Sequence, residues 1–347
     1  MSGLFLSPDL FTFHLAVVFI FGAMIGSFLN VCIFRLPRGQ SVNRPRRSFC
    51  PSCGTTIAWF DNIPVLSYVA LGGLCRHCGS WISARYWLVE LLTALLFSAV
   101  FWVHGYSLAT PLFLILTAAL IVSTFTDLDH WIIPDSVSLG GAAVGIAAAL
   151  AISAIQATGR WGAAGRSLSV SYPFETFGAW GIAANALAGA LFGFLLLWTV
   201  GVLGTLAFRK EAMGMGDMKL FACIGAFLGW QGCVLVLALA SFLGATLGLS
   251  LIAAQWIVSK IAPAASSMAS EANAATIGEP AADGATVTPA ALATETPPHA
   301  RPRGRQLHHL PFGPYIAVAG YLVALFYRPI VQWLMSHLFL LDLFSRR

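Results

Sequence analysis

The chain has 347 residues, of which 58% are hydrophobic and 10% are charged, and its formal net charge is +5. Charged residues make up about a quarter of a typical soluble domain, so this composition excludes a soluble globular protein and predicts an all-α polytopic membrane protein. The modest positive charge requires no nucleic-acid partner, because basic residues in cytoplasmic loops are attracted to anionic membrane lipid.

Apolar runs recur along the chain, most of them close to the roughly 20 residues that a helix needs to cross a bilayer, and they predict about eight transmembrane helices. The predicted spans are Leu10–Phe34, Tyr86–His104, Pro111–Thr126, Ser136–Ile155, Phe177–Phe208, a short sixth span Asp217–Trp230, Cys233–Val258 and Pro311–Tyr327. No basic segment precedes the first run and Arg35 follows it, which indicates a retained helix rather than a signal peptide. The shorter apolar segment Ile330–Leu341 is expected to lie along the membrane interface.

The arginines predict the orientation of these spans. Residues 35–85 carry seven arginines and a single acidic residue, Asp61. Positively charged loops remain on the cytoplasmic side, so this segment is expected to be cytoplasmic and the N-terminus to lie outside. Counting spans forward then places Asp127–Asp135 and Arg209–Gly216 at the cytoplasmic face as well.

Within residues 35–85, two C-x-x-C pairs contain Cys50, Cys53, Cys75 and Cys78. Two such pairs about 20 residues apart, each followed by a glycine, are typical of a structural zinc site with four thiolate ligands. A cytoplasmic location argues against disulfides, although unligated thiols and redox chemistry remain alternatives. The other cysteines lie in apolar runs and are expected to be buried as small hydrophobic residues.

Two aspartates stand beside apolar runs, where a charge is costly and usually functional. Asp127 ends the third run, and Asp217 begins the sixth within Gly-Met-Gly-Asp. Both are predicted at the cytoplasmic face, which indicates one shared site. Helix capping is the alternative for each, and it suits Asp135 well, whereas Asp129 is expected to be solvated.

Paired carboxylates are suited to peptide hydrolysis without a metal. Two carboxylates held close together cannot both ionise, so one keeps a proton. The ionised group activates water and the protonated group hydrogen-bonds the scissile carbonyl; the sequence assigns neither role to Asp127 or Asp217. Lys219 is expected either to hold a carboxylate or substrate group, or to extend to the interface.

The segment Ala262–Ala300 is rich in alanine, threonine and proline and has no aromatic residue. It cannot bury enough apolar surface to fold and is predicted to be disordered. The predicted organisation is therefore a first transmembrane helix (1–34), a cytoplasmic zinc-knuckle domain (35–85), a membrane catalytic core (86–258), a disordered cytoplasmic insert (259–310), and a last transmembrane helix with its tail (311–347).

Several motifs occur together in one order, and together they are specific. They are Gly26–Pro37, Phe49–Gly54, Trp59–Tyr68, Cys75–Gly79, Arg85–Glu90, Asp127–Asp135, Gly214–Lys219 and Pro311–Pro314. Through them the chain resembles the bacterial prepilin peptidases, the bifunctional type IV leader peptidase/N-methyltransferases, which are membrane aspartic proteases of the GxGD type. The resemblance covers most of the chain.

This resemblance implies an enzyme of the bacterial inner membrane. Its substrates would be type IV prepilins or type II secretion pseudopilins, whose leader is cut after a glycine on the cytoplasmic side. The new N-terminal amine would then be methylated by S-adenosylmethionine. The resemblance also links Cys50, Cys53, Cys75 and Cys78 to the methyltransferase activity. The residues that bind the methyl donor are not apparent, although Asn62, Glu90 and the arginines of 35–85 are candidates.

Three other functions remain alternatives from the sequence. A peptidase without methyltransferase activity is the nearest, and the presence of the knuckles favours both activities. A proton-coupled transporter would also use membrane carboxylates, usually near the midplane and within inverted repeats, and no repeat is visible. A non-enzymatic scaffold that docks partners through the knuckles would not need the two aspartates.

Overall fold

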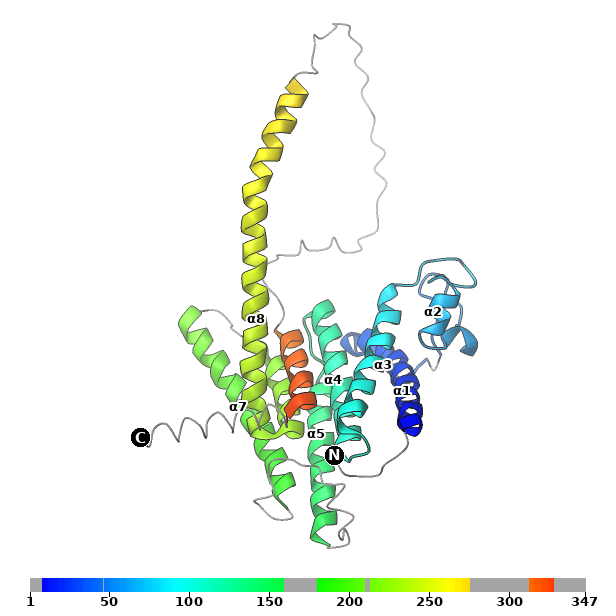
Figure 1. Cartoon of the computed structure of the whole chain (residues 1–347), viewed down its shortest axis with the longest axis vertical. Coiled ribbons are helices and arrows are strands. Elements are labelled where there is room, and N and C mark those ends of the chain that lie inside the picture. The colour runs from blue at the N-terminus through cyan, green and yellow to red at the C-terminus, as the bar shows by residue number, and fades with distance from the viewer. Residues whose placement is uncertain (1–7, 46, 159–179, 210–212, 275–311, 328–347) are drawn as a thin grey trace. The chain divides into compact units, whose positions relative to one another are not determined.

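A computed structural model describes residues 8–45, 47–158, 180–209, 213–274 and 312–327. Within these ranges the chain is helical, with two isolated β-bridges. Figure 1 shows the main helices, which are α1 (Pro8–Arg35), α3 (Ala84–His104), α4 (Ala109–His130), α5 (Asp135–Ala157), α7 (Gly181–Phe208) and α8 (Met215–Ala274). A shorter apolar helix, Gly313–Tyr327, follows them.

The described residues contain six helices that are long and apolar enough to cross a membrane. This confirms the all-α polytopic membrane fold. The predicted sixth and seventh spans are two halves of α8, which breaks at Gly229, where φ is 72° and ψ is 179°. The predicted eighth span corresponds to the shorter helix Gly313–Tyr327. The interfacial segment Ile330–Leu341 lies outside the described residues.

The chain divides into two compact units, Met1–Phe242 with Pro311–Arg347, and Leu243–Leu310. The described part of the second unit is the continuation of α8 to Ala274. Residues 262–274 of the predicted disordered insert are helical in this continuation. Alanine has the highest helix propensity, and extending an existing helix avoids the cost of nucleation. The rest of the insert lies outside the described residues.

Helices α1 and α3 pack antiparallel through small residues of α1. A Cβ atom at Gly22 would lie 2.8 Å from Ala94 Cα, and one at Gly26 would lie 2.7 Å from Glu90 Cα. Glycine therefore allows the two backbones to approach closely at both positions. Towards the other end of the pair, the ring of Phe11 stacks on Phe101 with centroids 5.6 Å apart.

The C-terminal half of α1, the N-terminal half of α3 and the C-terminal half of α4 share a hydrophobic cluster. Its buried members are Leu29, Cys32, Ile33, Val89, Ile121 and Val122, and Phe125 packs against them. Arg35 ends α1 in a buried position, and its Nη1 donates to the backbone oxygens of Ser41, Val42 and Pro45 at 2.9–3.2 Å. This arginine therefore holds the first part of the following loop against the end of α1.

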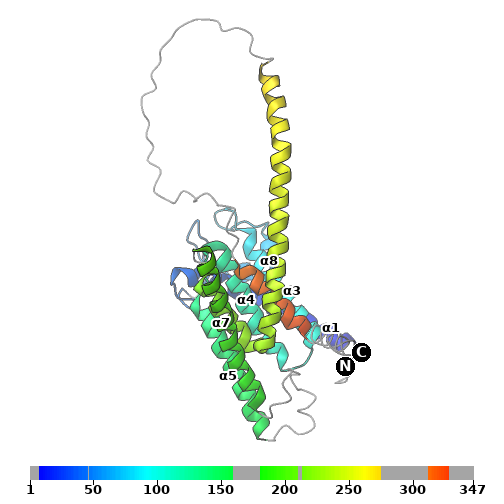
Figure 2. The ribbon, with the colours of Figure 1, turned by 90° about the vertical axis from the view of Figure 1, so that its left-hand side faces the viewer.

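Helices α5 and α7 lie side by side, as both views show (Figure 2). Helix α7 in turn packs closely on the first half of α8. A Cβ atom at Gly189 would lie 2.2 Å from Gly225 O, and one at Gly193 would lie 2.6 Å from Phe221 O. Any larger residue at these glycines would force the two helices apart.

The short last helix packs against α3, α4 and the first half of α8. Tyr321 Oη donates to Leu96 O at 2.9 Å, and Ala324 O lies 3.0 Å from His104 Nε2, at the far end of α3. A Cβ atom at Gly320 would lie 3.2 Å from Ile224 Cδ1. Its N-terminus, at Gly313, is therefore directed towards the end of the bundle where α3 begins and α4 ends.

Candidate active site

Asp127 lies in the last turn of α4 and is 7% exposed. The helix ends at Trp131, which adopts the left-handed conformation with φ 58° and donates its backbone N–H to Asp127 O at 2.9 Å. Residues 132–134 then lead directly into α5. The left-handed Trp131 therefore ends α4 one turn after Asp127.

Asp217 lies in the first turn of α8, half-buried. Gly216 packs against the α4–α5 loop, and a Cβ atom there would lie 3.2 Å from Ile133 Cβ. The glycine before the aspartate thus permits α8 to begin against Ile133. This close approach brings Asp217 to the end of α4 that carries Asp127.

The two carboxylates converge on Gly313. A Cβ atom at Gly313 would lie 2.4 Å from Asp127 Oδ2 and 3.4 Å from Asp217 Oδ1. These two oxygens are therefore no further apart than the sum of those distances. The backbone N–H of Gly313 hydrogen-bonds the Asp127 carboxyl group, so the last helix contributes a donor to the pair.

This arrangement is able to perform acid–base chemistry. The two carboxyl groups interact electrostatically, and like charges so placed are most stable when they share a proton. Asp127 Oδ2 is buried and has no hydrogen-bond partner among the described residues. Buried carboxylate oxygens are rarely left unpaired without a functional reason. This oxygen therefore retains an acceptor site for a water or a substrate group.

The neighbouring acidic residues have other partners. Lys219 Nζ binds Asp135 Oδ1 at 2.7 Å, so the lysine holds a carboxylate. Asp135 is the first residue of α5, and the N-cap position belongs to Pro134. The capping prediction for Asp135 is therefore wrong: its carboxylate instead links the start of α5 to the first turns of α8.

Asp129 pairs with Arg85 rather than being simply solvated. Arg85 Nη2 also donates to Phe125 O at 3.1 Å. One guanidinium therefore binds a carboxylate and a backbone carbonyl near the C-terminal end of α4, where a cation is favoured. Because Arg85 stands in the first turn of α3, this contact fixes the start of α3 to the end of α4.

The four knuckle cysteines form one cluster, with all their sulfur atoms within 4.8 Å of one another. Cys50 Sγ and Cys78 Sγ lie 3.9 Å apart, close to the separation of about 3.8 Å expected in a tetrahedral site with Zn–S bonds of about 2.3 Å. The donor set and its spacing therefore fit a structural zinc ion.

The two knuckles have the same backbone hydrogen bonds. In the first, Cys50 N donates to Thr55 O and Gly54 N to Cys50 O, both at 2.9 Å. In the second, Cys75 N donates to Ser80 O and Gly79 N to Cys75 O, again at 2.9 Å. Each therefore presents its two sulfurs from an equivalent tight turn.

The environment of two of the cysteines, Cys50 and Cys78, favours the thiolate form that binds metals. Hydrogen bonds from the backbone N–H groups of Cys53 and Ser52, and then from the Ser80 hydroxyl, lower the pKa of the Cys50 thiol to about 6. The Ser80 side chain also lowers the pKa of Cys78. Metal binding requires deprotonated cysteine, so less free energy is needed to release these protons.

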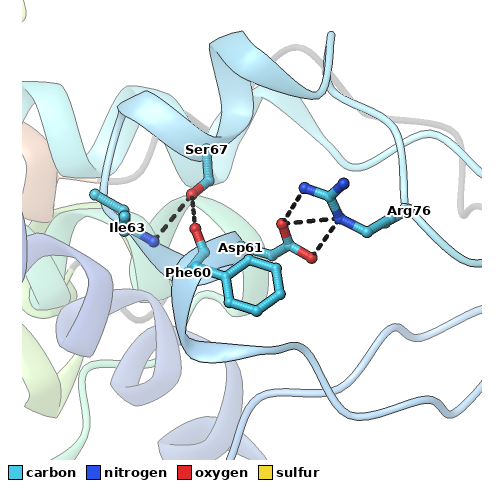
Figure 3. Close-up of polar contacts among 5 residues, drawn as sticks. All are labelled: Phe60, Asp61, Ile63, Ser67 and Arg76. Atoms are coloured by element: carbon cyan, nitrogen blue, oxygen red, sulfur yellow. Dashed lines mark hydrogen bonds and ion pairs between the residues drawn. The ribbon is translucent and has the colours of Figure 1, made fainter.

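A loop between the two knuckles is held from both sides. Figure 3 shows Arg76 of the second knuckle bound to both oxygens of Asp61, at 2.6–3.0 Å. This ion pair lowers the pKa of Asp61. Ser67 Oγ closes the loop by donating to Phe60 O and accepting from Ile63 N, both at 3.0 Å (Figure 3). From α3, Glu90 Oε2 accepts from Val65 N at 2.8 Å.

A cavity of about 820 Å³ lies between this segment and the ends of α1 and α3. Residues of both knuckles, of the loop between them and of both helices line it, among them Asn30, Asn62, Tyr68, Trp87 and Glu90. The sequence named Asn62 and Glu90 as candidate contacts. It gave no sign of the cavity itself, because the lining residues are up to 63 positions apart in the chain, from Ser27 to Glu90.

Gly313 was also missed as a site residue. The motif Pro311–Pro314 was recognised, but without a role, since its partners lie 96 or more residues away in the sequence. Only the packing of the last helix brings it to the two aspartates. Asp127 and Asp217 themselves do come together, as their predicted location at one face required, and so do the four cysteines.

Two family models match the chain. The bacterial peptidase A24 N-terminal domain matches residues 20–104, and the type IV leader peptidase family matches residues 114–249. These ranges contain the knuckle cysteines and both aspartates respectively.

Curated relatives agree with these models. The chain is 40% identical over 237 residues to the prepilin leader peptidase/N-methyltransferase of Myxococcus xanthus, covering 68% of this chain and 63% of that protein. It is 32% identical to the protein of the same name from Aeromonas hydrophila, covering 93% of this chain and 94% of that protein. A Pseudomonas aeruginosa protein of that name is 36% identical over 65% of this chain and 77% of its own length. No solved structure gave a significant match.

Proposed function

The chain belongs to the type IV leader peptidase family, and on that premise we propose that it cuts the leader from type IV prepilins or type II secretion pseudopilins and methylates the new N-terminus. The peptidase is of the aspartic type, with Asp127 and Asp217 as its catalytic residues. The observation that carries this proposal is the convergence of both carboxylates on Gly313.

The paired carboxylates carry out the hydrolysis together. The ionised member takes a proton from water as the water oxygen bonds to the scissile carbonyl carbon. The protonated member donates to the carbonyl oxygen, where negative charge develops. When the C–N bond breaks, its electron pair stays on nitrogen, which takes up a proton from the pair. The dyad then returns to its starting state with one shared proton.

Cleavage is proposed at the cytoplasmic face of the bacterial inner membrane, with the N-terminus of the enzyme outside. Arg85, Asp127, Asp217 and Gly313 all lie at one end of the helices, which supports a site at one face. Positively charged residues gather in the segment that precedes α3, and such segments remain cytoplasmic. A site at one end also argues against a transporter, whose carboxylates usually lie near the midplane.

Methylation is proposed to use S-adenosylmethionine, which supplies an electrophilic methyl group. The substrate amine, once it has lost a proton to the surrounding water, forms the N–C bond with its lone pair. The C–S bond breaks and its electrons pass to sulfur, leaving a neutral thioether. Zinc bound by Cys50, Cys53, Cys75 and Cys78 is proposed to be architectural, because a site closed by four thiolates leaves no open position for catalysis.

Mass spectrometry of one processed substrate tests both activities. Asp127→Asn and Asp217→Asn should each lower leader cleavage by at least about 10³-fold, within the range of about 10²–10⁴-fold that one acid–base group supplies. Asp135→Asn is the matched control, since its exposed carboxylate binds Lys219, and it should retain cleavage. Normal cleavage by either catalytic variant would exclude the two-aspartate mechanism. A cleaved but unmethylated product would leave a peptidase without the second activity.

A further inference from the structure

We propose that the cavity between the knuckle segment and the ends of α1 and α3 binds the methyl donor, with Glu90 facing its sulfonium cation. The methyl donor is an adenosyl sulfonium compound, which joins a purine nucleoside to a positively charged sulfur and an amino acid. This inference rests on the proposed methyltransferase function. It assigns the methyl donor to one cavity and its positive charge to one carboxylate.

The size of the cavity suits such a ligand. Its volume of about 820 Å³ lies within the range of roughly 300–1,000 Å³ that is typical of small-molecule sites. Its walls come from α1, α3, both knuckles and the loop between them. A site walled by several elements encloses a ligand more completely than a groove on one helix would.

Glu90 supplies the charge that a sulfonium requires. Its carboxylate is half-buried, and its partners are the backbone N–H of Val65 and the hydroxyl of Ser27. No cationic side chain pairs with Glu90 among the described residues. A buried carboxylate without a cation is costly, and a bound cationic ligand would offset that cost. Asp61, which also lines the cavity, differs because Arg76 already neutralises it.

Aromatic and amide groups suit the rest of the ligand. The rings of Tyr68 and Trp87 stack with centroids 6.3 Å apart and line the cavity together. Such a wall is suited to a purine ring, which stacks on aromatic faces. Asn62 lies on the loop between the knuckles, and Asn30 donates to Tyr86 O at 2.9 Å from the α1 wall. Their amides are able to hydrogen-bond a ribose or an amino-acid group.

The cavity adjoins the end of the helices where the substrate would be cut. Tyr86 lines it, and the preceding residue, Arg85, binds Asp129 and Phe125 O at the end of α4. Asp127 lies between those two contacts in the sequence. An amine released beside Asp127 therefore emerges at the end of the bundle that carries the cavity, and needs no passage across the membrane.

The leader of the substrate is a competing occupant, because its basic residues would also bind Glu90. The two possible occupants predict different effects of Glu90→Gln on donor binding and on leader cleavage. If the cavity holds the methyl donor, Glu90→Gln weakens donor binding and leaves the KM for leader cleavage unchanged. If it holds the leader, the same change raises that KM and leaves donor binding unchanged, which would overturn the proposal.

The experiment uses the purified full-length enzyme in lipid nanodiscs with radiolabelled S-adenosylmethionine. Equilibrium binding is measured for the wild type, Glu90→Gln and Ala58→Trp, which fills the cavity from the loop side. Each cavity variant should raise the Kd for the donor by at least tenfold, with leader cleavage within twofold of wild type. Asp135→Asn, outside the cavity, is the matched control and should leave the Kd unchanged.

Ultraviolet crosslinking of the labelled donor to the wild type tests the proposal without relying on the folding of the variants. A labelled peptide within residues 27–90 would support the cavity, and a label elsewhere would overturn it. Wild-type affinity in both cavity variants would also overturn it. If the wild type methylates its substrate and the cavity variants bind the donor normally, the cavity assignment is overturned but the methyltransferase proposal is not. If the wild type cleaves its substrate but neither methylates it nor binds the donor, the methyltransferase proposal is overturned as well.

Discussion

The knuckle segment and the carboxylate site are built in opposite ways. The four cysteines come from 29 consecutive residues, Cys50 to Cys78, and two of them are exposed. The carboxylate site joins three segments that lie about 90 residues apart in turn, at Asp127, Asp217 and Gly313, and it is enclosed by packed helices. The first brings four potential metal ligands together from one short segment, and the second depends on helix packing.

This difference indicates which kind of change would disrupt each region. A small segment with little apolar core derives its stability from the metal that links it. A site between helices depends on the volume of the residues that let the helices approach, since packed interiors tolerate little change. The following predictions test whether the two regions fail separately, as this comparison requires.

The largest effect is expected at Gly313. A Cβ atom there would lie 2.4 Å from Asp127 Oδ2, so Gly313→Ala should displace the carboxylate and lower leader cleavage by at least about 10²-fold, the typical result of an error of about 1 Å in a catalytic geometry. Zinc content should be unchanged. Gly140→Ala is the control, because a Cβ atom there meets nothing within 4 Å. Cleavage at the wild-type rate by Gly313→Ala would show that the two catalytic carboxylates do not converge on this glycine.

Replacing one of the four knuckle cysteines is expected to lower methylation without a matching loss of leader cleavage. Cys50→Ser should lower methylation by at least about tenfold, because zinc supplies on the order of 10 kcal/mol of folding free energy to such segments. Leader cleavage should be largely retained, since the aspartates are held by helix packing. Cys32→Ala, a cysteine in the apolar cluster, should keep the zinc. Equal loss of methylation and cleavage in Cys50→Ser would mean that the two regions form one unit.

The break in α8 tests the packed region without touching the carboxylates. Gly229 has φ 72°, and a Cβ atom there would lie 2.2 Å from Asn185 Nδ2. Gly229→Ala should therefore destabilise the protein by about 1–3 kcal/mol, seen as a lower unfolding temperature in detergent. Gly248→Ala, in open space on the same helix, should be neutral or slightly stabilising. An unchanged unfolding temperature for Gly229→Ala would contradict the strained conformation.

The smallest effect concerns Asp61 and pH. Because Arg76 lowers the pKa of Asp61 in the folded chain, the stabilisation is complete above its unfolded value of about 3.9 and is lost as the pH falls through the lower folded value. Hydrogen exchange of residues 59–71 should therefore quicken over that acidic range. Asp61→Asn should exchange faster at neutral pH and lose this part of the pH dependence. Identical profiles in the two proteins would show that the ion pair does not hold the loop.

The knuckles were predictable from the sequence because their geometry is local. Two C-x-x-C pairs with a following glycine specify a tight turn each, and Gly54 and Gly79 do adopt φ near +70°. The long helices were equally predictable, since apolar length alone determines them. The exception is α8, where two predicted spans are one helix with a break, because hydropathy does not report a local change in φ at Gly229.

The carboxylate site was predictable only in part. The cost of charge beside an apolar run pointed to Asp127 and Asp217, and the arginine pattern placed them at one face. No such signal marks Gly313, which is neutral and acts by being small. Nor does the sequence show that Asp135 binds Lys219 or that Arg85 binds Asp129, because these pairs depend on which helices are neighbours.

The matched turns of the two knuckles have a consequence for how such proteins diverge. Each turn contributes two sulfurs from the same hydrogen-bonded frame, so either turn alone would offer half a coordination sphere, too few ligands to hold the ion. Descendants of this architecture should therefore carry the pair as an indivisible module, or have lost it in a single step.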